Sequence, residues 1–251
     1  MCTVVILRRP GHDWPLLLAA NRDEMRDRAW RAPARHWPDR PDVVAGLDEA
    51  AGGTWMGLND HGVAAAILNR RGTLGPAAGK RSRGELVLDA LDHADAAEAA
   101  EALAALDGAA YRPFNMVVAD SRDAFWLKSL GDRRVAVAPL PDGLSMVTAF
   151  DRNDLASPRI AFNLPRFSAA AAPDPDAGDW TAWERLLASR DAGPDGGEEA
   201  AMNIDRTDGF GTSSASLVAL PDRTREHDRR PVWRFAAGAP DSAPFEAVKL
   251  R

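Results

Sequence analysis

The chain has 251 residues, 45% of them hydrophobic and 27% charged, so it can form one large domain or two small ones around a substantial core. Its net charge of −6 argues against nucleic acid as the main partner, because phosphate binding needs a basic surface. A single cysteine excludes an internal disulfide and a thiolate zinc site built from this chain alone. The histidines are scattered without metal-ligand spacing, so we expect no dedicated metal site.

The first segments predict two adjacent buried strands. These are Val4–Leu7 and Leu16–Ala20, which are joined by a turn-rich stretch. The first of these apolar runs is too short for a secretory signal, and no apolar stretch approaches the roughly 20 residues that a membrane helix needs. We therefore expect no transmembrane segment and a location in the reducing cytoplasm. Residues 26–41, rich in proline and arginine, are expected to form a long irregular loop that two tryptophans hold against the protein.

The middle of the chain predicts a hairpin followed by two helices. Gly52–Leu58 and Gly62–Asn69 are separated by an Asn-Asp-His-Gly turn that is typical of hairpins. Ser82 is the expected N-cap of the first helix, and Glu85 three residues later would complete a capping box. The alanine-rich stretch Ala94–Leu106 predicts the second helix.

The second half of the chain predicts strands again, then helices, then strands. Strands are expected at residues 114–119, 124–128, 135–138, 144–149, 214–220 and 231–235. Helices are expected at residues 157–167 and 180–189, with an exposed, mobile Ala/Pro/Asp-rich segment between them at 169–179. This order favours two stacked sheets covered by helices, in one domain spanning residues 1–251.

Cys2 is the candidate nucleophile. Removal of Met1 would leave its thiol and a free α-amine on the same residue, and an amine with a pKa of about 7.7–8.0 can act as the base for a thiol with a pKa of about 8.5. Two other interpretations stay open. Cys2 can be an inert core residue, as lone cysteines usually are, or a single axial ligand to haem iron.

Four polar residues, Asn21, Arg22, Asp23 and Glu24, follow the second apolar run. They can form part of a site, or a turn with ion pairs. If the strand continues through them, Asp23 and Glu24 point to opposite faces and cannot share one role.

Further along the chain, three residues are candidate ligand contacts. The glycines before Trp55 could allow a ligand to approach it closely, or could allow a turn while Trp55 fills the core. Arg70 and Arg83 belong to the most basic stretch, which ends at a predicted helix N-terminus and would suit a carboxylate, propionate or phosphate. A solvated charged surface is the alternative for this stretch.

Nine short segments, in this order, carry a resemblance to a known family: Met1–Thr3, Ala19–Glu24, Ala45–Asp48, Gly52–Leu58, Asn59–Gly62, Ser82–Leu86, Phe114–Asn115, Gly143–Ser145 and Phe210–Ser214. The chain resembles the NRDE family, also called the TANGO2 (transport and Golgi organisation 2) family. That family in turn resembles the N-terminal nucleophile (Ntn) hydrolases, and among them cysteine amidases such as choloylglycine hydrolases and penicillin V acylases. The resemblance implies an α+β fold, a four-layer αββα sandwich of two antiparallel sheets.

The same resemblance implies roles for four residues. Cys2 would be the nucleophile, and Asp23 would hydrogen-bond its free α-amine. Asn69 would help to form the oxyanion hole, while Arg22 fits the cation near the thiolate only loosely, because in the amidases the arginine precedes the asparagine. Acyl transfer needs each of these groups: a thiolate, a proton carrier and donors for the developing oxyanion.

The chain departs from the family pattern in two places. Members often carry Ser-Asn after Gly-Leu, whereas here Ser145 is followed by Met146 and the nearest asparagine is Asn153. Members also often carry Thr-Arg before Ser-Ser, whereas here Thr212 is followed by Ser213. If both missing groups serve catalysis, this chain would be slow, retuned or inactive.

Two functions therefore stay open. The first is a hydrolase in which Cys2 attacks a small amide or related acyl substrate. The second is a non-catalytic protein that binds haem or an acyl thioester such as acyl-CoA in the same pocket, since family members have been linked to haem trafficking and lipid metabolism. Haem as a ligand apart, no cofactor is expected. A pure interaction scaffold is not favoured by any feature of the sequence.

Overall fold

The computed structural model describes residues 2–194, 196–224 and 229–250, so Met1, whose removal the sequence analysis considers, lies outside the described residues. The chain divides into two compact units. The first consists of Met1–Asp27 and Pro141–Val248, and the second of Arg28–Leu140 with Lys249–Arg251. The following paragraphs take each unit by itself.

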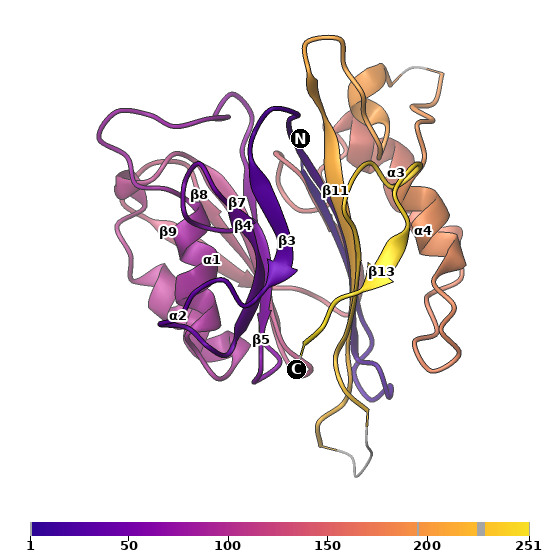
Figure 1. The fold of residues 1–251 in the computed structure, drawn as a ribbon, viewed down its shortest axis with the longest axis horizontal. Helices are drawn as coiled ribbons and strands as arrows, with labels where there is room; N and C mark the ends of the chain where they lie inside the picture. Colours follow the sequence, from indigo (N-terminus) through magenta and orange to yellow (C-terminus); the bar gives the residue numbers. More distant parts are fainter. Residues whose placement is uncertain (1, 195, 225–228, 251) are drawn as a thin grey trace. The chain divides into compact units, whose positions relative to one another are not determined.

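The first unit is built on an antiparallel sheet (Figure 1). In spatial order its strands are β10 (Gly143–Val147), β1 (Thr3–Arg8), β2 (Leu16–Met25), β11 (Phe210–Leu220), β12 (Val232–Ala236) and β13 (Phe245–Ala247). The β-branched and leucine-rich runs of β1 and β2 suit strands buried on both faces, because successive side chains point to opposite sides. The two central strands, β2 and β11, therefore lie at opposite ends of the sequence.

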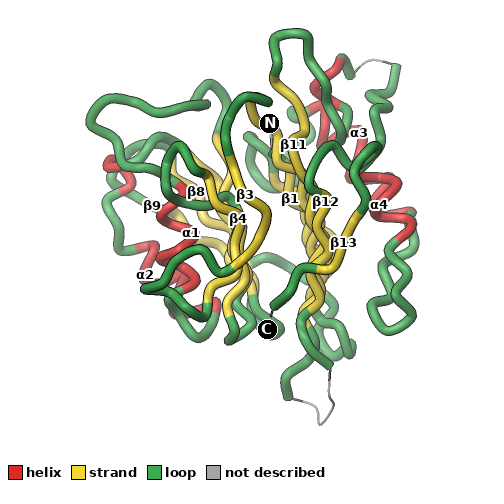
Figure 2. Tube along the Cα trace, viewed as in Figure 1, coloured by secondary structure: helices red, strands yellow, loops and turns green. Residues whose placement is uncertain are grey.

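Helices cover one face of this sheet, as Figures 1 and 2 show. They are α3 (Pro158–Ala169), α4 (Thr181–Leu187) and the short 3₁₀ helix η2 (Glu198–Ala200). Ser157 caps α3 by accepting a hydrogen bond from the Ile160 N–H, and proline at the first helical position suits the start of a helix. Trp183 of α4 and Phe167 of α3 pack edge-to-face, with ring centroids 5.5 Å apart, within the core between these helices and the sheet.

The second unit is an antiparallel sheet whose strands follow one another in chain order. They are β3 (Trp30–Ala34), β4 (Val43–Asp48), β5 (Met56–Asn59), β6 (Ala64–Asn69), β7 (Phe114–Ala119), β8 (Ala124–Ser129) and β9 (Val135–Pro139). Helices α1 (Gly84–Leu91) and α2 (Ala96–Ala104) pack their apolar sides on one face of this sheet (Figure 1). The single-turn 3₁₀ helix η1 (Gly108–Ala110) leads into β7.

The fold class expected from the sequence is confirmed, since both units combine an antiparallel sheet with helices in an α+β arrangement. The assignment of the whole chain to one domain stays a prediction. In the part of the chain that the structure describes, no helix is long and apolar enough to cross a membrane.

The expected irregular loop over residues 26–41 is wrong, because it contains strand β3. This strand pairs with β4, with Trp30 opposite Asp48, and its register shifts between Arg31 and Ala34. The shift surrounds Pro33, which lacks the N–H that a regular ladder needs. Edge strands tolerate proline, and β3 lies at the edge of its sheet.

The expected capping box at Ser82 is also wrong. Helix α1 begins at Gly84, with Arg83 at the N-cap position, and Ser82 Oγ accepts only the Gly84 N–H at 3.3 Å. Gly84 packs directly on another backbone, because a Cβ there would lie 3.0 Å from the nitrogen of Thr54. Glu85 forms an ion pair with Arg81 at 2.8 Å. A glycine at position 84 therefore allows the start of this helix to lie against the backbone of Thr54.

Candidate functional site

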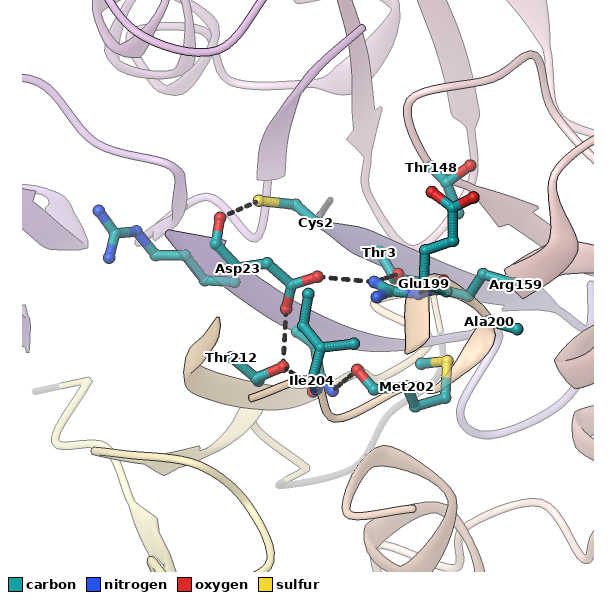
Figure 3. A network of polar contacts seen from close by, with 12 residues as sticks. Cys2, Thr3, Asp23, Thr148, Arg159, Glu199, Ala200, Met202, Ile204 and Thr212 are labelled. Carbon is teal, nitrogen blue, oxygen red and sulfur yellow. Dashed lines mark hydrogen bonds and ion pairs between the residues drawn. The ribbon is translucent and has the colours of Figure 1, made fainter. Parts of the chain in front are cut away.

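The pairing of β1 with β2 brings the start of the chain beside the polar end of β2. Thr3 lies opposite Asn21 in this pairing. Cys2, one residue before β1, is half-buried, and its thiol donates to the backbone carbonyl of Asp23 over an Sγ–O distance of 3.5 Å (Figure 3). The fold of the first unit therefore brings two of the expected catalytic residues together.

The Cys2 thiol is held in its protonated form. Burial raises its pKa, and the negative charge of Asp23 raises it further, while Arg22 acts in the opposite direction. A thiol is a much weaker nucleophile than a thiolate, so chemistry at Cys2 requires a base that removes its proton.

Asp23 is a fully buried carboxylate with partners on both oxygens. Its Oδ2 accepts from Nη1 of Arg159 at 2.7 Å, and its Oδ1 accepts from Oγ1 of Thr212 at 2.8 Å. Figure 3 shows the carboxylate between these two side chains. Burial alone would raise the pKa of Asp23, but nearby positive charge, including Arg159, and these hydrogen bonds hold it below its usual value. Asp23 is thus ionised across the neutral range.

Arg159 is a buried charged residue beside Asp23 that the sequence analysis missed. It lies in the first turn of α3, its side chain is fully buried, and its Nη1 also donates to Oγ1 of Thr3 at 2.9 Å. Its Nε donates to the carbonyl of Glu199 at 3.2 Å. The signal in the sequence is that Arg159 falls on the buried stripe of α3, next to Ile160 and four residues before Asn163. A charged residue within an apolar helical stripe points to a buried partner.

The four polar residues of β2 belong to the strand, which continues to Met25, and not to a turn. Side chains on a strand alternate between faces, so Asn21 and Asp23 share the side covered by helices. Asn21 Nδ2 donates to the carbonyls of Leu187 and Met202, each at 2.9 Å, which fixes the segment after α4 against the sheet.

Arg22 is buried, and its side chain points to the face of the sheet opposite that of Asn21 and Asp23. Its Nη1 donates to Oγ of Ser213 at 3.0 Å, and the same hydroxyl donates to the Arg22 carbonyl at 3.2 Å. Ser213 is the extra residue of a bulge, because the pairing of β2 with β11 shifts between Thr212 and Ser214. Glu24 Oε1 accepts the N–H of the next residue at 2.9 Å.

Asn153 is engaged with strand β10. It has a positive φ of 54°, a conformation that asparagine tolerates better than most residues. Its Oδ1 accepts the N–H of Met146 at 2.7 Å. Asn153, the nearest candidate for the amide expected after Gly-Leu, therefore binds the backbone of β10 with its side-chain oxygen.

The remaining expected site residues lie in the second unit. Asn69 is the last residue of β6, opposite Phe114, and is half-buried. Trp55 is also half-buried and packs edge-to-face on Trp30, with ring centroids 5.8 Å apart. Its ring fills the space beside Gly46, where a Cβ would lie 2.3 Å from the ring. The roles of Asn69 and Trp55 toward a substrate stay predictions.

Arg70 and Arg83 bind groups of their own unit. Nη1 of Arg70 donates to Oδ1 of Asn115 at 2.8 Å. Nη1 of Arg83 donates to Oγ1 of Thr73 at 3.0 Å and to the carbonyl of Pro113 at 3.1 Å. These contacts organise the loop between β6 and α1, and a role of either guanidinium in anion binding stays a prediction. Among the residues that the structure describes, no three His, Cys, Asp or Glu side chains gather as a metal ion would require.

Comparison with known proteins matches this chain to one family and one fold. Residues 1–157 match the family model for Transport and Golgi organisation 2. A stretch of 110 residues is 39% identical to the Transport and Golgi organization protein 2 homolog of Bos taurus and 34% identical to that of Homo sapiens. The match covers 42% of this chain and 38% of each relative, so it spans well under half of their length.

Among solved structures, the Caenorhabditis elegans N-acylethanolamine-hydrolyzing acid amidase (NAAA) ortholog is similar with a TM-score of 0.59. The sequences are 13% identical, and the similarity covers 89% of this chain and 95% of the other. At this identity the likeness shows the fold alone, and that fold is the one implied by the sequence resemblance. Because the family model matches more than half of its residues, the chain belongs to the TANGO2 family, with an Ntn-hydrolase-like fold.

Proposed function

We propose that this protein is a cysteine amidohydrolase in which Cys2, after removal of Met1, attacks a small amide or related acyl substrate. The observation that carries the proposal is the placement of the Cys2 thiol beside a buried, ionised Asp23. The sulfur lies 3.5 Å from the Asp23 carbonyl oxygen, and both carboxylate oxygens of Asp23 are fixed by hydrogen bonds.

The base in this mechanism is the α-amine of Cys2. While Met1 is attached, the nitrogen of Cys2 is an amide and cannot accept a proton. Once it is free, an amine with a pKa of about 7.7–8.0 can take the proton of the thiol. Asp23, acting as a hydrogen-bond acceptor, would orient this amine. The raised pKa of the Cys2 thiol makes such a base necessary.

The proposed cycle has two halves. The sulfur attacks the carbonyl carbon and forms a C–S bond, while the carbonyl π electrons move to oxygen. Collapse of this intermediate breaks the C–N bond, and the protonated α-amine gives its proton to the leaving amine. Water, deprotonated by the same α-amine, then attacks the thioester carbon and forms a C–O bond. The C–S bond breaks, the carboxylic acid leaves, and the protonated α-amine returns its proton to sulfur. Asn69 is our candidate donor for the oxyanion, and Arg22 our candidate cation near the sulfur.

The first test is intact mass with peptide mapping after brief exposure to an acylating probe at near-neutral pH. We expect the purified protein to lack one methionine and to be acylated at residue 2, and we expect Cys2→Ala to remain unlabelled. A substrate screen over small N-acyl amides would follow, since the structural relative is named as hydrolysing N-acylethanolamines. Retention of Met1, or a Cys2 that reacts no faster than a free cysteine, would contradict the proposal.

Two observations favour a second candidate, binding without turnover. Burial raises the pKa of the Cys2 thiol, and Asn153, the nearest candidate for the expected amide, is bound to the backbone of β10; both weaken nucleophilic chemistry. In this case the same residues would bind an acyl thioester or haem. Titration with acyl-CoA and with haem would then show saturable binding without product. If Cys2 is a ligand of the haem iron, Cys2→Ala should lose that coordination.

A further inference from the structure

We propose that Arg159 is a positioning residue of this site: from helix α3 it keeps the Asp23 carboxylate ionised and fixed in orientation beside residue 2. This inference rests on the function proposed above. Arg159 would not touch the substrate or the reacting atoms, and it acts through Asp23.

The first argument is the number of segments that one guanidinium joins. Nη1 is shared between Oδ2 of Asp23 at 2.7 Å and Oγ1 of Thr3 at 2.9 Å. Nε donates to the carbonyl of Glu199 at 3.2 Å. Arg159 thereby ties α3 to β1, β2 and η2 at the point where the chain enters the sheet (Figure 3). Thr3 follows Cys2 in the chain, so Arg159 contacts both Asp23 and the residue next to the proposed nucleophile.

The second argument is burial. The side chains of Arg159 and Asp23 are both 0% exposed. A buried ion pair loses its hydration and often adds little to stability, so its retention calls for another reason. In contrast, the Arg40–Asp92 pair of the second unit is 26% and 45% exposed, although its geometry is also good, with Nε 2.9 Å from Oδ1. The buried pair places a fixed negative charge where water is absent, and the exposed pair does not.

The third argument is that the carboxylate has little freedom left. Its other oxygen accepts from Oγ1 of Thr212, and this hydroxyl accepts in turn from the Ile204 N–H at 3.0 Å. The proton of the Thr212 hydroxyl is therefore directed to Asp23. An acceptor held on both oxygens presents its remaining lone pairs in set directions, which is what an orienting group for an amine requires.

Charges around Asp23 decide whether it stays ionised. The groups that shift the Asp23 pKa include the amino terminus of the chain and Arg159 from α3, and Asp23 in turn acts on the thiol of Cys2 before β1. Arg22 and Glu24 flank it on β2. Strand β11 carries no charged side chain, whereas η2 carries Glu198 and Glu199, of which Glu199 contacts Arg159 through its backbone carbonyl. Burial is the largest influence on the Asp23 pKa and acts upward. Without the Arg159 guanidinium, less positive charge would oppose the effect of burial, and the pKa of Asp23 would rise.

The experiment compares Arg159→Met, Arg159→Lys, Asp23→Asn and the Arg159→Met/Asp23→Asn double variant, with Arg40→Met as the matched control. Acylation of Cys2 is followed between about pH 4 and pH 9, which needs no knowledge of the substrate. We expect the acid limb of the profile to move upward by about one to three pH units in Arg159→Met, the effect that an opposite charge at this distance has on a carboxylate. Arg159→Lys should recover part of the shift, and Arg40→Met should show none.

The double variant tests whether Arg159 acts through Asp23. In the Asp23→Asn background, Arg159→Met should change the labelling rate by less than about twofold, because the coupling is lost with the carboxylate. Labelling that falls equally at every pH in Arg159→Met, or effects of the two substitutions that multiply, would overturn the proposal and leave Arg159 a packing residue.

A direct titration keeps the inference separate from the proposed function. Carboxyl ¹³C NMR follows Asp23, with Asp23→Asn identifying its signal. The signal should titrate at a higher pH in Arg159→Met than in wild type, and in Arg159→Lys if the first variant fails to fold. If Cys2 cannot be acylated at all, the proposed function fails. A higher titration midpoint of Asp23 in the variant would still support the inference that Arg159 keeps Asp23 ionised. An unchanged titration would overturn it.

Discussion

At the scale of single residues, Asp23 links the stability of this protein to pH. Its carboxylate is buried, which by itself raises the pKa. The positive charge of the amino terminus and of Arg159, with the hydrogen bonds from Arg159 and Thr212, outweighs burial and holds the folded-state pKa below the usual value. A carboxyl group that is more acidic in the folded than in the unfolded state stabilises the fold above its unfolded pKa of about 3.9. That stabilisation is lost as the pH falls through the folded pKa.

We therefore expect Asp23→Asn to lower the free energy of unfolding at neutral pH by about 3–5 kcal/mol, because it leaves a buried guanidinium without its counter-charge. The difference from wild type should shrink as the pH falls below about 4, where the unfolded chain is protonated as well. Urea unfolding at pH 7 and in acid measures both effects. A difference that grows toward acid would contradict the assignment of a lowered pKa.

Cys2 gives a second prediction at this scale. With its nitrogen blocked by an uncleavable N-terminal extension, Cys2 has only its own thiol to offer, and burial raises the pKa of that thiol. Alkylation of the extended chain by iodoacetamide should therefore have its midpoint above about 8.5, the value of a free cysteine. Acylation at neutral pH should be lost as well. Equal reactivity of the extended and processed chains would show that the α-amine has no part in the chemistry.

At the scale of elements, the start of α3 sets the position of Arg159, which lies in its first turn. Ser157 Oγ accepts from the Ile160 N–H at 3.4 Å and lies 3.3 Å from Oγ1 of Thr148. We expect Ser157→Ala to cost about 1 kcal/mol of stability, the usual price of a lost N-cap, and to slow the labelling of Cys2.

A matched control exists at the start of α2. Asp95 caps that helix by accepting the Glu98 N–H at 2.9 Å, within the second unit. Asp95→Ala should cost a similar free energy of unfolding and leave the labelling rate of Cys2 unchanged. Equal effects of both substitutions on labelling would mean that the loss follows general destabilisation and not the position of Arg159.

The accuracy of the sequence-based expectations varied from element to element, for physical reasons. Strand β7 was predicted at its observed limits, since Phe114–Ala119 is an apolar run bounded by turn residues. Strand β3 was missed because Pro33 argues against a strand unless it lies at an edge, which the sequence does not reveal. The start of α1 was misplaced because contact of Gly84 with Thr54 joins residues 30 positions apart.

The same limit explains what could be learned of the site. Cys2 and Asp23 belong to short motifs near the start of the chain, and the resemblance pointed to both. Arg159 and its contact with Asp23 span 136 positions in sequence, and a surface arginine has the same letter as a buried one. Only the packing of α3 on the sheet identifies which arginine is paired with Asp23.

At the scale of the whole molecule, the first unit is discontinuous in sequence. Residues Met1–Asp27 join Pro141–Val248, with Arg28–Leu140 between them. The family model ends at residue 157, so the two residues that bind the Asp23 side chain, Arg159 and Thr212, both lie beyond the matched part. We therefore expect a chain truncated after residue 157 to lose rapid labelling of Cys2, because β2 then lacks its neighbour β11. Rapid labelling of that fragment would mean that the first strands alone form the site.

The central position of β2 between β1 and β11 also sets an order of events during synthesis. The ribosome releases β1 and β2 first, and the partner that binds the second carboxylate oxygen of Asp23 follows 189 positions later. Until then the nascent chain carries Cys2 without the full set of hydrogen bonds around Asp23. The contacts around Asp23 are thereby completed only after Thr212 has been synthesised, so we expect Cys2 to be acylated slowly in nascent chains that end before β11.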